Sequence, residues 1–277
     1  MISDPVHLGG NEGWDAIVVA AGRGERLGHG RPKAYIPLQG RPLFVYSLRV
    51  LLSHPGVENA FLVVTPGAEE REEVARQIEL HLPAEERGRI RLVEGGAERQ
   101  DSVWNALQLL DEAETSPERM LVIHDAARPL LTHGLLARCL HSMVHIKVEP
   151  GQAELPGLAR SGPWGSGPAA VVPGLPVRDT LKLVFEDRVV LTHARENLYA
   201  VQTPQLFRFG PLLHAHRRAR EFGMRATDDS ALLEWQGIPI HLVAGEIMNW
   251  KVTFPDDLQL VTRLLAVQDQ SGEEEKP

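Results

Sequence analysis

The first predicted strand of this chain runs directly into a glycine-rich loop. Residues 15–21 are apolar from Ile17 onward, as expected of a strand covered on both faces, and Gly22 follows at once. Glycine has no Cβ, so the backbone N–H groups of such a loop can approach an anion closely. This junction therefore predicts an α/β fold with a candidate anion site after its first strand.

Strands and helices are expected to alternate through the rest of the first two thirds of the chain. The pattern predicts strands at 61–65, 90–93, 120–124 and 169–172, and helices at 43–52, 69–82, 99–110 and 135–146. Such alternation is typical of a Rossmann-like, mostly parallel sheet with helices on both faces. Ligands of these folds bind where loops leave the carboxyl ends of the strands.

Charge and cysteine content exclude several classes of protein. Lys and Arg number 29 against 37 Asp and Glu, a net charge of −8, whereas nucleic-acid binding depends on clustered positive charge. The single cysteine, Cys139, allows neither an internal disulfide nor a Cys-rich zinc site. No apolar stretch reaches about 18 residues, and the first ten residues lack the pattern of a secretory signal. We therefore expect a cytoplasmic protein with no nucleic-acid or membrane partner.

One segment interrupts the alternation. Residues 147–166 are rich in proline and glycine and are interpreted as an insertion within a single domain spanning 14–268. Residues 1–13 would form an N-terminal extension, and 269–277 an acidic tail whose glutamates, Glu273 and Glu274 among them, are expected to be solvated and frayed.

Two glycine-containing loops carry cations or a hydroxyl that could bind phosphate. Arg26 and Lys33 follow the first strand, but the spacing Gly22-x-Gly24-x-x-x-Gly28 matches neither the dinucleotide fingerprint nor the Walker pattern, so an ordinary tight turn is the alternative. In the second loop, Arg99 and Ser102 lie one turn apart where a helix opens after two glycines, a ready anion site. There the alternative is that Asp101 and Ser102 only start the helix.

The loop after the predicted strand 120–124 begins with Asp125, a carboxylate where a magnesium ligand would be needed. His124 is interpreted as a buried histidine with structural hydrogen bonds. Asp228 and Asp229 stand where a helix at 230–235 would begin. His214 and His216 are the closest histidine pair, and without a third ligand at a recognisable spacing they are expected at the surface.

Taken together, the motifs are far more specific than any one of them. The pieces AAGRGERLG with PKAY, GGAERQDSV, HDAARP, PVRDTLK, TPQLF, TDDSALLE and NWKVTFPDDL run from Ala20 to Leu258. In this order they resemble the 2-C-methyl-D-erythritol 4-phosphate cytidylyltransferases of the non-mevalonate isoprenoid pathway. The resemblance implies transfer of CMP from CTP to methylerythritol phosphate with Mg²⁺ and release of pyrophosphate. It also implies a nucleotidyltransferase-type fold whose protruding β-arm, about 176–197, swaps across a homodimer.

The resemblance further implies a role for each matching position. A catalytic set of cations would act on the phosphates of CTP (Arg26 and Lys33) and on the sugar phosphate (Arg195 and Lys251). The nucleotide would be bound by Ala20, Ala21, Gly22, Gly24, Gly96, Arg99, Ser102 and Ala126, and Mg²⁺ by Asp125. Arg128, Thr180, Thr203 and Thr227 would help to bind the sugar phosphate, with Thr180 and Arg195 serving the partner subunit's site.

Two departures and three alternatives remain open at this point. Met248 stands where some members carry an acidic residue, which puts a second protein carboxylate on the metal in doubt, and Trp250 stands where a smaller aliphatic residue is commoner. Another polyol phosphate, such as ribitol 5-phosphate, is the nearest alternative acceptor. A nicotinamide-dependent oxidoreductase would need an acidic residue at the end of the strand 61–65, which offers only Thr65, Pro66 and Gly67. A non-catalytic descendant is not favoured, because the cations and Asp125 are all present.

Overall fold

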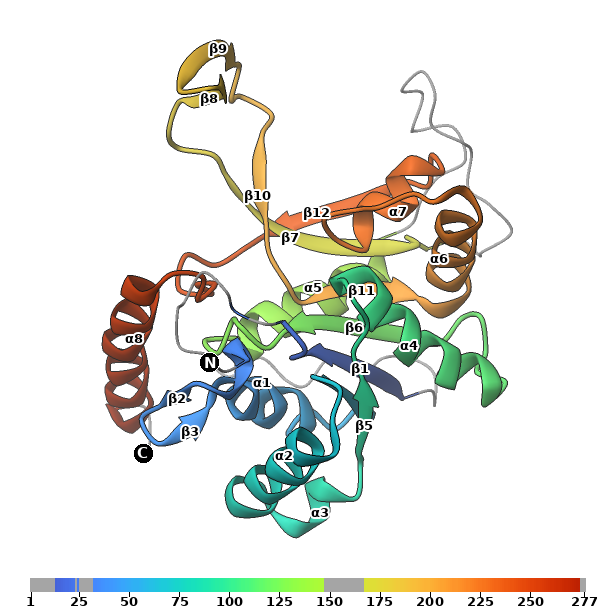
Figure 1. Ribbon diagram of the computed structural model, residues 1–277, viewed down its shortest axis with the longest axis vertical. Helices are drawn as coiled ribbons and strands as arrows, with labels where there is room; N and C mark the ends of the chain where they lie inside the picture. The colour runs from blue at the N-terminus through green and yellow to red at the C-terminus, as the bar shows by residue number, and fades with distance from the viewer. Residues whose placement is uncertain (1–12, 23, 25–31, 147–166, 275–277) are drawn as a thin grey trace.

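A single twisted sheet with helices on both faces forms the body of the protein (Figure 1). The computed structural model describes residues 13–22, 24, 32–146 and 167–274, with side chains described as far as 267. The sheet has eight strands: β1 (Trp14–Val19), β4 (Val57–Val64), β5 (Ile90–Glu94), β6 (Met120–Asp125), β7 (Ala170–Pro176), β10 (Tyr199–Val201), β11 (Gln205–Arg208) and β12 (Ile240–Ala244). Their order is β10-β7-β11-β6-β1-β4-β5, and β12 also pairs with β7.

The sheet is mostly parallel, as the alternation predicts. β1 is parallel to both β4 and β6, and β4 is parallel to β5. β11 is antiparallel to both β6 and β7, so those two strands run in the same direction, and β12 is parallel to β7. The carboxyl ends of six strands therefore lie at one edge, where a ligand is expected. The insertion of β11 between β6 and β7 is not evident from sequence, because its four residues show no periodicity.

Two apolar clusters hold the helices against the two faces of the sheet. In β1, Ala16 and Val18 belong to one cluster, whereas Ile17 belongs to the other, because successive side chains of a strand point to opposite faces. Helices are observed wherever the sequence predicts them, and the predicted bounds 43–52 and 230–235 are confirmed. The helical segments are η2 (Lys33–Tyr35), α1 (Leu43–Leu52), α2 (Ala68–His81), α3 (Ala84–Arg87), α4 (Arg99–Glu112), α5 (His133–His145), α6 (Phe209–Phe222), α7 (Ser230–Trp235) and α8 (Pro255–Glu274).

The acidic tail differs from expectation at its start. α8 continues to Glu274, so Glu273 and Glu274 belong to a helix rather than to a frayed end. Nothing after Pro255 in this segment is a strong helix breaker except Gly272, and glutamate has a good helix propensity. The N-terminal extension as far as residue 12, the insertion 147–166 and residues 275–277 lie outside the described residues.

A β-hairpin stands away from the main sheet (Figure 1). It consists of β8 (Leu181–Phe185) and β9 (Arg188–His193), which pair antiparallel. It lies inside the segment, about 176–197, for which the family resemblance implies a protruding arm. Its apolar side chains are exposed, with Phe185 at 68% and Val190 at 62%. A further two-stranded ribbon joins β2 (Pro37–Leu38) to β3 (Arg41–Pro42). Within the described part of the chain, none of the helices has the length and apolar character needed to cross a membrane.

Candidate active site

The loop after β1 brings Lys33 beside its glycines. The Lys33 amide donates to the Gly22 carbonyl at 3.2 Å, and Gly24 has a φ of +66°. A Cβ at position 24 would lie 2.8 Å from the Lys33 Cβ, so glycine is required both by the backbone conformation and by this close approach. Ala20 is buried, whereas Ala21 and Gly22 are accessible. The predicted phosphate ligand Arg26 lies outside the described residues.

The second loop, between β5 and α4, packs directly on the first. A Cβ at Gly95 would collide with the Ala21 side chain, so the two loops approach through glycine. The Ser102 hydroxyl accepts from the Gly96 amide at 3.1 Å and donates to the Glu98 carbonyl at 3.0 Å. Asp101 forms a capping box with Glu98 at the start of α4, so it does start the helix. A nucleotide-binding role for Gly96 and Ser102 stays a prediction.

Asp125, at the carboxyl end of β6, is the centre of the charged cluster. Its Oδ1 accepts from Arg99 Nε at 3.1 Å, and its Oδ2 accepts from Lys251 Nζ at 2.6 Å. Burial alone would raise the pKa of this carboxyl, but Arg99, Lys251 and Arg128 together hold it well below its ordinary value. Asp125 is therefore ionised at neutral pH, and three segments far apart in sequence meet on it.

His124 and Thr203 hold the backbone of Asp125 in place. The Thr203 hydroxyl accepts from the Asp125 amide at 3.0 Å and lies 3.2 Å from His124 Nδ1, while His124 Nε2 lies 3.1 Å from the Arg128 carbonyl. A carbonyl only accepts, so Nε2 carries the proton and Nδ1 accepts from Thr203. Burial lowers the pKa of His124 to about 4, which keeps the ring neutral. The structural interpretation of His124 is thus confirmed.

The loop that carries Lys251 is tied to the same centre. Asn249 is fully buried; its side-chain Nδ2 donates to the Thr203 carbonyl at 2.8 Å, and its own carbonyl accepts from Arg128 Nη1 at 2.8 Å. Arg99 Nη2 and Arg128 Nε are buried donors without a hydrogen-bond partner among the described residues. Unpaired buried donors on two guanidinium groups are uncommon, and an anionic ligand beside Asp125 would account for them.

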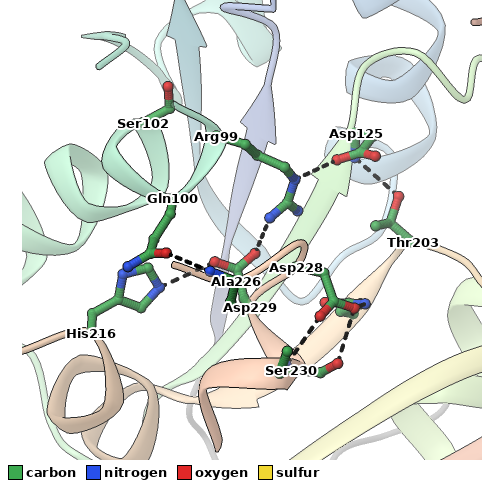
Figure 2. A network of polar contacts seen from close by, with 12 residues as sticks. Arg99, Gln100, Ser102, Asp125, Thr203, His216, Ala226, Asp228, Asp229 and Ser230 are labelled. Carbon is green, nitrogen blue, oxygen red and sulfur yellow. Dashed lines mark hydrogen bonds and ion pairs between the residues drawn. The ribbon is translucent and has the colours of Figure 1, made fainter. Parts of the chain in front are cut away.

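Asp229 and His216 belong to this cluster, and sequence reasoning missed both (Figure 2). Asp229 is buried and accepts from Arg99 Nη1 at 2.5 Å and from His216 Nε2 at 3.1 Å. His216 is fully buried, so the expectation of a surface histidine is wrong for it. The signal was present: His216 lies four residues after Leu212 and three before Ala219, on the apolar face of α6. Asp228, the residue before Asp229, starts α7 as predicted: its side chain accepts from the Ala231 amide at 3.0 Å.

Three other predicted substrate-binding residues do not meet at this centre within the described chain. Thr180 and Arg195 lie in the exposed arm, where the Arg195 guanidinium donates to the Arg178 carbonyl. Thr227 is exposed in the loop that precedes α7. Ala126, in contrast, is buried directly after Asp125, with its amide on the Val19 carbonyl at 3.1 Å.

The residues around Asp125 fit a magnesium ion that would be held mainly by phosphates of the substrate. Among the described residues there is no group of three His, Cys, Asp or Glu that could hold a metal, so Asp125 would supply one carboxylate. Mg²⁺ is commonly held by one or two carboxylates together with substrate phosphates, which agrees with a single carboxylate at this edge. Position 248 supplies a methionine, which is not a ligand for Mg²⁺.

Trp250 and Cys139, to which the sequence assigns no part in the reaction, both have contacts or burial that the structure explains. Trp250 donates from its indole Nε1 to Asp257 at 2.8 Å, and Asp257 also accepts from the two amides, of Thr253 and Phe254, just before α8. Cys139 is buried in α5, and burial raises its pKa to about 12. This thiol is protonated at neutral pH, so it is not activated as a nucleophile.

Comparisons with known proteins point to one family. Residues 15–149 and 165–266 match the family model described as 2-C-methyl-D-erythritol 4-phosphate cytidylyltransferase. Proteins of that name from Corynebacterium efficiens and Symbiobacterium thermophilum are 38% identical over 254 residues and 37% identical over 262 residues; the matches cover 90% and 94% of this chain and 92% and 96% of those proteins.

Solved structures with the same name have the same fold. The cytidylyltransferase from Francisella tularensis superimposes with a TM-score of 0.71 at 25% identity, covering 91% of this chain and all of that one (100%). The structure from Thermus thermophilus gives a TM-score of 0.65 at 30% identity, covering 90% of this chain and 98% of that one.

Proposed function

The chain belongs to the 2-C-methyl-D-erythritol 4-phosphate cytidylyltransferase family, and we propose that it performs the family's reaction by metal-assisted in-line displacement at a site shared between two subunits. As a member of this family it is a nucleotidyltransferase that forms 4-diphosphocytidyl-2-C-methyl-D-erythritol from CTP and the sugar phosphate.

The observation that carries the mechanism is the meeting of Arg99, Asp125 and Lys251 at the carboxyl edge of the sheet. The two glycine loops after β1 and β5 adjoin this edge and pack on each other. Glycine loops offer backbone N–H groups to phosphates, and Lys33 adds a charge beside the first loop. The arrangement therefore supports a triphosphate lying along the loops, with its α-phosphate near Asp125 and Lys251.

The reaction requires no general base in this site. The acceptor phosphate is already anionic at neutral pH, so one of its oxygens attacks the α-phosphorus of CTP directly. A P–O bond forms on one side while the bond to the β-phosphate oxygen breaks on the other, and pyrophosphate leaves with the electron pair. Lys251, Arg195 and Lys33 would offset the repulsion between the anions, because positioning and electrostatics supply most of the catalysis in phosphoryl transfer.

We assign the metal position to Asp125. A bound Mg²⁺ supplies charge neutralisation on the triphosphate and polarises its phosphoryl oxygens. Asp125 is buried, ionised and orientated by Thr203 and Arg99, which suits a carboxylate that holds a metal in one position.

We also propose that the arm joins two copies of the chain. The hairpin exposes Leu183, Val184, Phe185, Val189 and Val190, each at least half exposed, on an element that projects from the sheet (Figure 1). Contiguous exposed apolar groups of this kind mark an interaction surface. A second copy would cover them and, by the same contact, would receive Thr180 and Arg195 near its Asp125.

Pyrophosphate release from the purified protein tests the acceptor and the metal together. We expect release with CTP, Mg²⁺ and methylerythritol 4-phosphate, and none with ribitol 5-phosphate or with a chelator in place of Mg²⁺. Release with ribitol phosphate alone would show that the acceptor assignment, which rests on the arm and the acceptor residues, is wrong. A thiophosphate analogue of CTP, chiral at the α-phosphorus, should react with inversion, and retention would contradict direct displacement.

Replacing Arg195 with alanine should raise the KM for methylerythritol phosphate by about 10- to 100-fold, because a hydrogen bond to a charged group contributes about 1.5–3 kcal/mol. The KM for CTP should change little, and steady-state kinetics with each substrate varied in turn measures both. Arg188→Ala, on the same hairpin, is the matched control and should resemble the wild type. A larger rise in the KM for CTP than for the sugar phosphate would remove Arg195 from the acceptor site.

A further inference from the structure

Arg99 is divided between two carboxylates (Figure 2). Its Nε lies 3.1 Å from Asp125 Oδ1, and its Nη1 lies 2.5 Å from Asp229 Oδ2. A guanidinium beside a single carboxylate commonly binds it through two parallel N–H bonds. Here Asp125 receives only one of these bonds, and its second oxygen is left to Lys251 Nζ at 2.6 Å.

Asp229 is held beside Arg99 by its other contacts. Its second oxygen, Oδ1, lies 3.1 Å from His216 Nε2, and both side chains are buried. The His216 ring stacks on Trp104 of α4, with centroids 6.4 Å apart and planes at 20°. The loop before Asp229 is also fastened to α4, since Gln100 accepts from the Ala226 amide at 3.0 Å (Figure 2). Asp229 is thus held from α4 and α6 at once.

We propose that Asp229, with His216 behind it, is a positioning residue of the CMP transfer: it draws Arg99 away from a two-point contact with Asp125, so that one oxygen of Asp125 stays available to Lys251. The inference rests on the proposed function of Asp125 and Lys251. Neither Asp229 nor His216 needs to touch a substrate. Their effect passes through Arg99 alone.

The charges explain why the loss of Asp229 would matter. Two carboxylates, Asp125 and Asp229, lie among three cations, Arg99, Arg128 and Lys251. If Asp229 lost its charge, Asp125 would be the remaining carboxylate within reach of Arg99. Arg99 would then direct two of its nitrogens to Asp125 and compete with Lys251 for it. The backbone amides of the glycine loops, which we propose to bind CTP, would keep their positions.

Asp229→Asn keeps the shape of the side chain and removes its charge. We expect kcat to fall by about 10- to 100-fold, the usual effect of losing a residue that orientates a metal ligand or catalytic group. The KM for CTP should change less than kcat, because the backbone amides of the glycine loops still bind the triphosphate. The matched control is Asp228→Asn, the same change one residue earlier; Asp228 bonds to Gln205, Ser230 and Ala231 instead of Arg99. It should keep kcat close to the wild type.

A second pair of variants tests the role of His216. His216→Gln can still donate to Asp229 from its Nε2 and should recover most of the kcat that His216→Leu loses. An equal loss of kcat in Asp228→Asn and Asp229→Asn would indicate a general disturbance of α7 and would overturn the inference. So would equal activity of the glutamine and leucine variants.

A double-mutant cycle decides whether the effect passes through Arg99. In an Arg99→Ala background, Asp229→Asn should lower kcat no further, and a full additional loss would overturn the inference. Asp125→Asn separates this inference from the function on which it rests. If Asp125→Asn has wild-type turnover, the proposed role of Asp125 fails. If it is impaired while Asp229→Asn is not, only the positioning role of Asp229 fails.

Discussion

Lys33→Ala is expected to lower the turnover of CMP transfer by about 100- to 1,000-fold, the loss found when one preorganised group that stabilises transition-state charge is removed. Lys33 is held against the first glycine loop, with its amide on the Gly22 carbonyl at 3.2 Å. This backbone contact places Lys33 beside the loop along which the triphosphate is proposed to lie. Binding of CTP should survive in part, because the backbone amides of the loop remain.

Two measurements separate these effects. Single-turnover kinetics gives the rate of the transfer, and titration of CTP without acceptor gives the affinity. Arg41→Ala removes a nearby exposed cation from β3, outside the site, and should leave both quantities unchanged. Wild-type turnover in Lys33→Ala would remove Lys33 from the mechanism.

Two variants that are each impaired at low acceptor concentration, Lys251→Ala and Arg195→Ala, are expected to recover activity when they form mixed dimers. Lys251 lies on the Asp125 centre, whereas Arg195 lies on the arm that we propose to cross to the partner. A mixed dimer then contains one site with both changes and one site with neither. With random mixing, half of the dimers are mixed, so we expect about a quarter of the wild-type activity at low acceptor concentration.

The control is to mix each variant with itself by the same procedure, which should give no recovery. Mixing Lys251→Ala with Lys33→Ala provides a stricter comparison, since both residues belong to the body of one subunit and no mixed dimer would hold an intact site. Sedimentation confirms that dimers have formed. Mixed dimers of Lys251→Ala and Arg195→Ala without activity would show that the arm serves its own subunit, and would contradict the shared site.

Local periodicity explains why most of the body could be predicted from sequence. The run Ile17 to Ala21 and the spacing of Val103, Ala106, Leu107 and Leu110 reflect burial that each element shows in its own residues. The bounds of α1 and α7 follow in the same way. β11 could not be predicted, because a four-residue strand is held by its neighbours β6 and β7 rather than by a pattern of its own.

For the candidate site, too, the features that lie in contiguous motifs could be predicted from sequence. The motifs around Gly24, Arg99 and Asp125 are contiguous, so the sequence alone indicates three loops at one edge of an α/β sheet, and the family to which they belong. Local sequence also accounts for Asp228, which starts the helix that follows it.

Which charges meet was decided only by the tertiary structure. Arg99 and Asp229 are 130 positions apart and Asp125 and Lys251 are 126 apart, yet both pairs are in hydrogen-bond contact. Helical spacing could place His216 on the apolar face of α6, but sequence could not show that it bonds to Asp229, because its partner depends on what packs against that helix. Such contacts depend on how β6, α4, α6 and the loop before α8 are brought together, and the folded sheet alone sets those distances.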